Sequence, residues 1–128
     1  MVVLDTNVII DHIRRSQNTK TILDAIETRA SQGQLALSMI SVQELFVGRS
    51  TRDEKKVKFL LFLLGTLNIL PYSHEIAQRA GEIVRDLNRS IEFPDAAIAA
   101  TALIHGAELA TLNKKDFRGI TDLRLYPI

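Results

Sequence analysis

Cysteine and tryptophan are absent from these 128 residues, and glycine, proline and aromatic side chains are scarce. Without cysteine the chain has no disulfide, no thiolate zinc site, no cysteine nucleophile and no thiol redox motif. Five Phe and two Tyr offer little material for a platform on which single-stranded bases stack. The absences exclude thiol chemistry and disfavour recognition of RNA by base stacking.

An excess of one charge is also missing, because 16 Lys and Arg residues are balanced by 15 Asp and Glu residues for a net charge of +1. A strongly basic coat for nucleic acid is therefore excluded, and a phosphate-bearing partner must be bound at a local site. The hydrophobic fraction of 46% is too high for a disordered chain. The length is typical of one domain, so we predict a single domain over residues 1–128.

Long hydrophobic runs are missing as well. The most apolar stretch, residues 59–64, continues to Leu70 only in broken form. It is well short of the roughly 18 unbroken apolar residues that a membrane span needs. Asp5 interrupts the amino terminus too early for the core of a signal peptide. We therefore expect no membrane segment and a cytoplasmic location.

Short apolar runs alternate with helical patterns along the chain. An amphipathic stripe over residues 76–87 follows Ser73 as its N-cap, and a second helix starts at Pro94 and stops at Gly106. The strand candidates are residues 2–4, 35–38, 67–72, 108–111 and 123–126. Uninterrupted apolar strands that alternate with helices predict an α/β fold with a central parallel sheet of about five strands and helices on both faces.

Four carboxylates follow the predicted strands. Asp5 comes directly after the first strand, Glu44 about one helical turn after the second, and Asp116 after the fourth. Asp95 lies in the first turn of the helix that Pro94 begins. Ligands of open parallel sheets bind beyond the carboxyl ends of the strands. We therefore expect all four side chains at the same edge of the sheet.

Each of these acids alone has an ordinary structural explanation as a turn, cap or surface residue, but the set is harder to explain in that way. Gathering like charges destabilises a fold unless a cation neutralises them. Hard oxygen ligands without cysteine or suitably spaced histidine favour Mg²⁺ or Mn²⁺ over Zn²⁺. Such ions stabilise charge on a phosphoryl group and generate hydroxide from bound water. The pattern therefore predicts metal-dependent hydrolysis of a phosphodiester.

Four sequence motifs resemble those of PIN-domain nucleases, in the family's order and over essentially the whole chain. Residues 4–10, LDTNVII, are similar to the family's opening motif, and Glu44 within SVQEL matches the second. Residues 93–102, FPDAAIAATA, are similar to the third motif, and TLN followed by DF at 111–117 to the fourth. In size and motif order the chain is most similar to the VapC toxins of VapBC toxin–antitoxin pairs.

This resemblance implies a specific activity and specific partners. VapC-type proteins are Mg²⁺- or Mn²⁺-dependent endoribonucleases that cut structured RNA such as tRNA or ribosomal RNA, and they are commonly homodimers. A cognate VapB-like antitoxin, usually encoded just upstream, binds the toxin and blocks its site. By analogy, Asp5, Glu44, Asp95 and Asp116 form the catalytic, metal-binding pocket.

Four polar residues match motif positions beside these acids, namely Thr6, Asn7, Thr111 and Asn113. The resemblance implies that they orient carboxylates or waters around the metal. Helix capping and turn formation are an equally good explanation of the same residues. Residues 89–93, RSIEF, depart from the family, which usually has a small residue before its third motif.

Candidate binding surfaces are small. Lys114 and Lys115 adjoin the fourth motif and are the best candidates for contact with RNA phosphates, followed by Arg14 and Arg15. Residues 59–64 are apolar on every side of a helix. This pattern predicts a helix that faces both the core and an interface, to a second subunit or to an antitoxin segment. The alternative is a helix enclosed entirely within the monomer.

Two other protein families also place a functional Asp after a strand, but their further requirements fit this sequence less well. A haloacid-dehalogenase-like phosphatase needs a second Asp where this chain has Asn7, and a receiver module needs its acceptor Asp after a middle strand. Two alternatives within the PIN fold stay open. One is an RNA-processing nuclease outside a toxin–antitoxin pair, and the other is a catalytically inactive module that binds RNA or a partner.

Overall fold

The computed structural model describes residues 1–15, 19–31 and 33–128. In these residues four strands form one parallel sheet, in the order β3-β2-β1-β4, and helices connect them. The elements are β1 (Val2–Leu4), α1 (Thr6–Arg15), α2 (Ile22–Arg29), β2 (Leu35–Ser38), α3 (Met39–Val47), η1 (Arg49–Arg52), α4 (Glu54–Leu64), β3 (Asn68–Leu70), α5 (His74–Asp86), α6 (Phe93–Ile104), β4 (Glu108–Ala110) and η2 (Lys114–Phe117). The predicted α/β class with a parallel sheet is confirmed.

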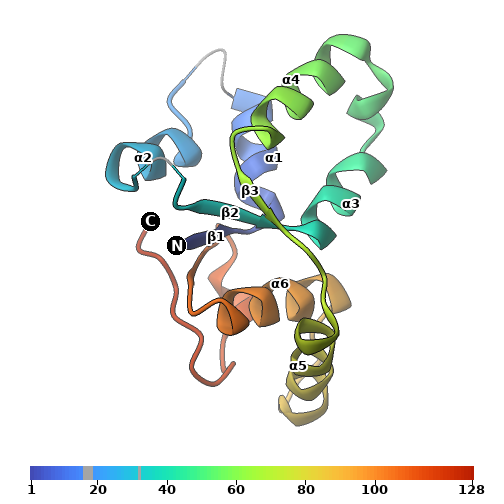
Figure 1. Cartoon of the computed structure of the whole chain (residues 1–128), viewed down its shortest axis with the longest axis vertical. Coiled ribbons are helices and arrows are strands. Elements are labelled where there is room, and N and C mark those ends of the chain that lie inside the picture. Colours follow the sequence, from blue (N-terminus) through green and yellow to red (C-terminus); the bar gives the residue numbers. More distant parts are fainter. Residues whose placement is uncertain (16–18, 32) are drawn as a thin grey trace.

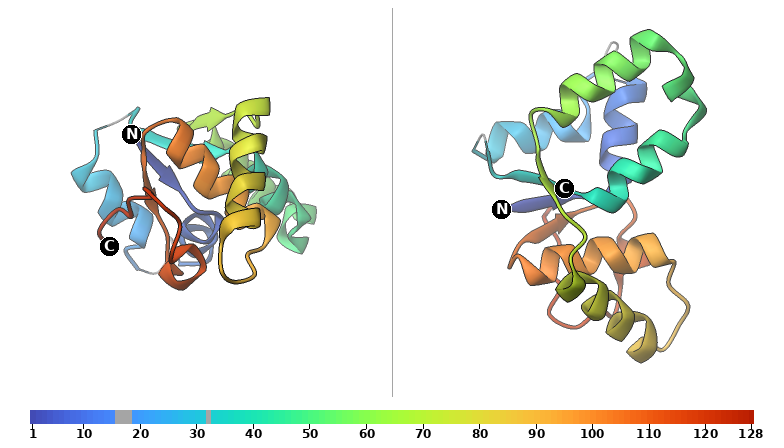
Figure 2. Two further views of the ribbon diagram at one scale, coloured as in Figure 1. Left: turned by 90° about the horizontal axis from the view of Figure 1, so that it is seen from below. Right: turned by 45° about the vertical axis from the view of Figure 1, so that its right-hand side comes forward.

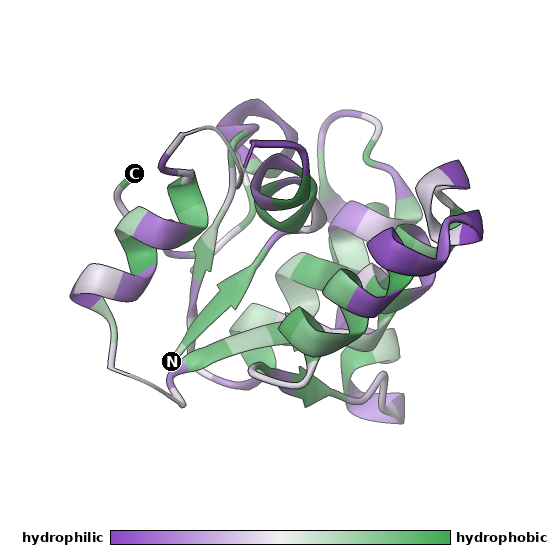
Figure 3. Ribbon diagram, turned by 90° about the horizontal axis from the view of Figure 1, so that it is seen from above, coloured by the Kyte–Doolittle hydropathy of each residue, from purple (hydrophilic) through white to green (hydrophobic). Residues whose placement is uncertain are grey.

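The sheet separates two hydrophobic cores. Helices α1 to α4 lie on one face, and α5, α6 and the carboxyl-terminal segment lie on the other (Figures 1 and 2). Successive side chains of a strand point to opposite faces. In β1, Leu4 therefore packs in the core on the α1 side, whereas Val3 packs in the core with α5 and α6. Because both faces are covered, most strand residues are apolar and buried, and the strands are the largely green arrows in Figure 3. Asn68 at the start of the edge strand β3 is exposed.

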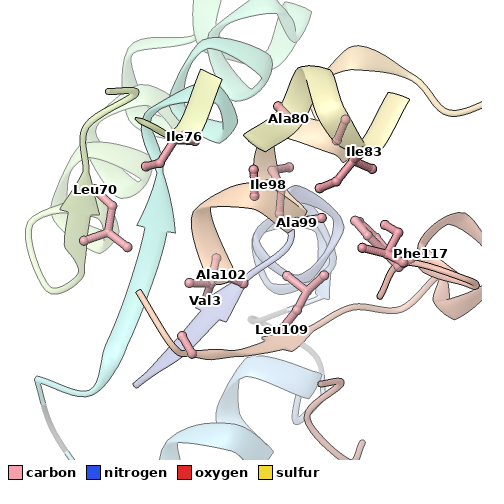
Figure 4. Packing of buried hydrophobic residues seen from close by; sticks show 14 of the residues in the cluster. Val3, Leu70, Ile76, Ala80, Ile83, Ile98, Ala99, Ala102, Leu109 and Phe117 are labelled. Carbon is pink, nitrogen blue, oxygen red and sulfur yellow. The ribbon is translucent and has the colours of Figure 1, made fainter. Parts of the chain in front are cut away.

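Helix α6 runs through the second core and ends as the sequence predicts. All of residues 96–102 are buried, and Ile98 and Ala99 lie between the sheet and α5 (Figure 4). Pro94 occupies the first turn, where its missing N–H costs no hydrogen bond. At the other end, Gly106 has a φ of 61°, and its N–H donates to the carbonyl of Leu103 at 3.1 Å. This left-handed glycine closes the helix.

The sheet has four strands rather than the five predicted. The segment at 123–126 forms only an isolated bridge, in which Leu125 pairs with Leu109. Asp122 with a φ of 66° turns the chain just before this segment, and Pro127 follows it without an N–H to donate. The third strand is also shorter than predicted, because Pro71 ends the pairing after Leu70.

Helix α4 is only half covered by its own chain. Asp53 caps it by accepting hydrogen bonds from two backbone N–H groups, and Leu60 and Leu63 pack in the first core. On its other side, Leu61 and Phe62 are 53% and 77% exposed. The alternative of a helix enclosed within the monomer is therefore wrong. Across the described residues, no helix has the length and apolar character needed to cross a membrane.

Candidate active site

The four predicted acids come from four elements at the carboxyl ends of the strands. Asp5 directly follows β1, and Asp95 lies in the first turn of α6. Glu44 lies in α3 after β2, and Asp116 lies in the short helix η2 after β4. Each of the other three acids raises the pKa of Asp95, so the four side chains lie near enough to repel one another. The topology thus gathers the carboxylates at one edge.

Asp5 is almost fully buried at the centre of this group and is held at both oxygens. Its Oδ1 accepts a hydrogen bond from the N–H of Thr6 at 2.8 Å, and its Oδ2 accepts one from the Thr111 hydroxyl at 2.7 Å. Burial raises the pKa of Asp5, and repulsion by Glu44 and Asp116 raises it further. The two hydrogen bonds act in the opposite direction, but the pKa stays above its ordinary value.

Asp95 lies in the first turn of α6 and is affected by burial and by four neighbouring acids. Its pKa is raised to about 6, first by burial and then by the charges of Asp5, Asp116, Glu44 and Glu92. A carboxylate with this pKa is destabilised at neutral pH, because it is partly removed from water and lies among other negative charges. Repulsion between the carboxylates therefore destabilises the metal-free site, and a bound cation would reduce this repulsion.

Glu44 is oriented by a pair of buried hydroxyl groups. The Oγ1 atom of Thr6 lies 2.6 Å from the Oε1 atom of Glu44 and 2.8 Å from the Oγ atom of Ser41. A hydroxyl group has one proton, so Thr6 donates it to the carboxylate and accepts a hydrogen bond from Ser41. This chain of hydroxyl groups connects the start of α1 to α3 and fixes one rotamer of Glu44.

A second polar network holds the loop after β4. The hydroxyl of Thr111, which donates to Asp5, accepts a hydrogen bond from the N–H of Asn113 at 3.0 Å and one from the side-chain amide of Asn7 at 3.5 Å. The Asn7 side-chain oxygen in turn accepts from the N–H of Leu112 at 3.2 Å. All three hydrogen-bonding positions of the Thr111 hydroxyl are thus occupied.

Asp116 is oriented by the last of the four predicted polar residues. The side-chain amide of Asn113 donates to the Oδ2 atom of Asp116 at 2.7 Å. Phe117, the next residue, is buried in the second core and anchors η2 to the body of the protein. The structure thus places Thr6, Thr111 and Asn113 in direct contact with carboxylates, and Asn7 one hydrogen bond further away.

Two residues of this cluster were not predicted from the sequence to belong to the site. Ser41 precedes Glu44 by three positions, and a helix places such residues on the same face. That spacing is a signal that was present in the sequence. Glu92, which helps to raise the pKa of Asp95, precedes α6 and matches no motif. Its role depends only on how the loop folds.

The donor chemistry of the site fits a hard divalent cation. In residues 1–15, 19–31 and 33–128, no group of three or more His, Cys, Asp or Glu side chains is already arranged to hold a metal ion. However, four carboxylates supply oxygen ligands only, which suit Mg²⁺ or Mn²⁺. The pKa values of Asp5 and Asp95 are raised first by burial and then by the neighbouring negative charges, which such an ion would neutralise.

A groove of about 870 Å³ borders the site between α1, α3 and α4. Glu44 lies in its lining, and so does Arg14, one of the predicted RNA contacts. Arg15 instead pairs with Asp11 at 3.0 Å. Lys114 and Lys115 are exposed on η2. The complete lining is Ile10, Ile13, Arg14, Glu44, Leu45, Gly48, Arg49, Ser50, Thr51, Lys55, Lys56, Phe59 and Leu60.

Comparison with known proteins identifies the family. The PIN domain model matches residues 2–123. Ribonuclease VapC10 of Mycobacterium tuberculosis is 34% identical over 116 residues, which cover 88% of this chain and 83% of that protein. Ribonuclease VapC1 of Rickettsia felis is 33% identical over 98% of this chain and 95% of its own length. A solved toxin–antitoxin complex from Klebsiella pneumoniae contains a chain that superposes with a TM-score of 0.77 at 31% identity, with both chains covered completely. The chain therefore belongs to the PIN-domain family and, within it, to the VapC ribonucleases.

Proposed function

We propose that this protein hydrolyses phosphodiester bonds within RNA, in a reaction that depends on Mg²⁺ or Mn²⁺ bound by Asp5, Glu44, Asp95 and Asp116. The observation that carries the proposal is the convergence of these four carboxylates at one edge of the sheet, where burial and then the charges of the neighbouring acids raise the pKa of Asp5 and of Asp95. The ribonuclease names of the relatives support the same reaction.

The residues of the chain would bind and orient the reacting groups. The four carboxylates would hold the cation. When bound, the cation would lower the pKa of the attacking water and offset negative charge on the phosphate. Thr6 fixes Glu44, Thr111 fixes Asp5, and Asn113 fixes Asp116 through the hydrogen bonds described above. Such partners preserve the geometry of ligands that would otherwise move apart by repulsion.

The substrate proposal rests on local positive charge. Lys114 and Lys115 directly precede Asp116 in sequence and are exposed, so they are available to RNA phosphates at the site. Arg14 supplies a further charge from the groove beside Glu44. Contacts of this kind read the backbone and shape of structured RNA, such as tRNA or ribosomal RNA, rather than its bases.

A VapB-like antitoxin is the proposed protein partner, and the groove is its proposed docking site. The Klebsiella pneumoniae relative was solved as a toxin–antitoxin complex. The groove combines apolar side chains from α1 and α4, such as Ile13 and Phe59, with the cations Arg49, Lys55 and Lys56. A segment with apolar and acidic side chains fits this lining. Because Glu44 lies in the same groove, its occupant would also restrict access to the acids.

Exposed apolar side chains outside the groove support a homodimer. Val47 at the end of α3 is 78% exposed, and Phe62 of α4 is similarly open. Large exposed apolar side chains of this kind favour association with another surface. Light scattering of the purified protein over a range of concentrations tests this part of the proposal, and a monomer at every concentration would contradict it.

Cleavage of RNA by the purified protein tests the catalytic proposal. We expect cleavage with Mg²⁺ or Mn²⁺ that EDTA, Asp5→Asn and Asp95→Asn each abolish. Cleavage that needs no metal and survives both substitutions would overturn the mechanism. A reading frame for a DNA-binding antitoxin directly upstream of the gene would support the toxin–antitoxin assignment. An active enzyme without such a neighbour would instead favour an RNA-processing role.

A further inference from the structure

Arg89 connects two segments that carry site residues. It lies in the loop between α5 and α6, which leads directly to Asp95. Its Nη2 atom donates to the backbone carbonyl of Asp116 at 2.9 Å and to that of Arg118 at 2.6 Å, and its Nη1 atom donates to the carbonyl of Ser90 at 3.2 Å. The guanidinium group therefore spans from the loop before α6 to the end of η2.

The turn that carries Asp116 has little else to fix its carboxyl end. Helix η2 is a single 3₁₀ turn without a side-chain cap at its amino end. The backbone hydrogen bonds at its two ends are long, at 3.2 Å from the N–H of Asp116 to the carbonyl of Asn113 and 3.4 Å from the N–H of Arg118 to the carbonyl of Lys115. Short 3₁₀ helices have poor hydrogen-bond geometry, and the last carbonyls of a helix need partners from outside it. Phe117 anchors one side of the turn, and Arg89 supplies partners for two of its carbonyls.

We propose that Arg89 is a positioning residue that holds the Asp116 turn against the loop preceding Asp95, so that the two carboxylates keep the separation that a shared cation requires. The proposal rests on the proposed metal-dependent function. Arginine suits this role because its planar group directs several N–H donors at fixed angles, whereas lysine offers one flexible ammonium group.

Arg124 provides a matched control for any general loss of stability. It also donates from Nη2 to a backbone carbonyl, that of Gly106 at 3.0 Å. Gly106 follows the carboxyl end of α6, whereas Asp95 lies at the amino end. Removing Arg124 therefore removes the same kind of contact at the far end of the same helix. A difference in Mn²⁺ binding between Arg89→Ala and Arg124→Ala would therefore indicate a specific role of Arg89 in the site.

Calorimetric titration of the metal-free protein with Mn²⁺ measures the proposed effect. We expect Arg89→Ala to weaken Mn²⁺ binding about tenfold, as loss of a residue supporting a metal ligand does, and Arg89→Lys to be intermediate. Arg124→Ala should bind Mn²⁺ like the wild type. In an Asp116→Asn background, Arg89→Ala should have no further effect, because Arg89 acts through that carboxylate. Equal losses from Arg89→Ala and Arg124→Ala, or full additivity with Asp116→Asn, would overturn the proposal.

Hydrogen exchange in the absence of metal provides a second readout. In Arg89→Ala the N–H groups of Asp116 and Arg118 should exchange faster than in the wild type, while those of α6 stay unchanged. Unchanged exchange at both groups would overturn the positioning role even if Mn²⁺ binding fell. If the wild type itself binds no Mn²⁺, the proposed metal-dependent function fails, and the exchange rates still decide whether Arg89 fixes the turn.

Discussion

Helices α6 and α4 are both apolar around much of their circumference, but they differ in how much of that surface is buried within the monomer. In α6 all of residues 96–102 are buried between the sheet and α5. In α4 only Leu60 and Leu63 are buried, and Phe62 is left 77% exposed. The difference lies in side-chain size, because α6 is largely alanine whereas α4 carries phenylalanine and leucine.

Small side chains allow close approach on every side, so the monomer covers residues 96–102 of α6 completely, although Phe93 at the start of the helix is exposed. The fixed helix then presents Asp95 from its first turn at a set position among the other acids. Helix α4 has more apolar surface than its own chain covers, and part of it lines the groove beside Glu44. An all-round apolar helix therefore indicates a core element in one case and an interface in the other.

The largest expected effect is on the rate of RNA cleavage, when an acid in the first turn of each helix is replaced by its amide. Asp95→Asn should lower the rate of RNA cleavage about 10³-fold, since losing several kcal/mol of metal-assisted stabilisation costs that factor. Glu54→Gln, in the first turn of α4, is the matched control and should leave the rate unchanged. Steady-state cleavage assays with Mn²⁺ make the comparison. Similar rates for the two variants would remove Asp95 from the mechanism.

Changes in side-chain size should affect the two helices differently. Ala99→Leu adds volume at a fully buried position of α6 and should lower the free energy of unfolding by about 1–3 kcal/mol. Phe62→Ala on α4 should change it by no more than about 0.5 kcal/mol, because that ring is mostly exposed. Urea denaturation of both variants at protein concentrations where the chain is monomeric gives the values, because the proposed dimer would cover exposed apolar side chains such as Phe62. If Phe62→Ala were then as destabilising as Ala99→Leu, the exposed face of α4 would have to be packed within the monomer.

Within α4 the groove-facing ring should matter more for antitoxin binding than the outward one. Phe59 lines the groove beside Glu44, whereas Phe62 does not. Phe59→Ala should weaken binding of the cognate antitoxin about tenfold, as truncation of a buried aromatic anchor does, and Phe62→Ala should leave the affinity within about twofold. Calorimetry with the purified antitoxin measures both. The reverse order would place the antitoxin on another face of α4.

The smallest expected effect is on the pH dependence of stability. The pKa of Asp95 is about 6 in the folded protein and near 3.8 when unfolded. Between these values the folded state binds the extra proton, so this group makes the metal-free protein less stable as the pH rises from 4 to 7. Because the side chain is partly open to water, screening reduces the loss to on the order of 1 kcal/mol.

Urea midpoints of the metal-free wild type and of Asp95→Asn at pH 5 and pH 7 isolate this contribution. The wild type should lose more stability between the two pH values than the variant, and saturating Mn²⁺ should remove the difference at pH 7. Identical pH dependence of the two proteins would show that the pKa of Asp95 is not raised in the folded state.

Much of this architecture was predictable because local patterns determine it. Pro94 and Gly106 mark the ends of α6, and the positions of Asp5 and Asp95 next to a strand and a helix start place them at the sheet edge. The prediction of a fifth strand was wrong, because a short apolar run does not reveal that the turn at Asp122 and Pro127 limit this segment to an isolated bridge.

Other parts of the site have no local pattern. Arg89 contacts a backbone carbonyl 27 residues further along, and any residue type offers a carbonyl there. The groove beside Glu44 arises from three helices whose angles depend on packing across the whole first core. In both cases the contact depends on tertiary placement, which neither residue type nor spacing encodes.

Titration of the metal-free wild type and of Asp5→Asn with Mn²⁺ tests most directly whether the four carboxylates act as one cation site. We predict that the wild type binds Mn²⁺ at pH 7.5 and that Asp5→Asn binds at least about tenfold more weakly, since loss of a supporting residue alone costs that much. Absence of Mn²⁺ binding by the wild type, or equal binding by Asp5→Asn, would contradict the account.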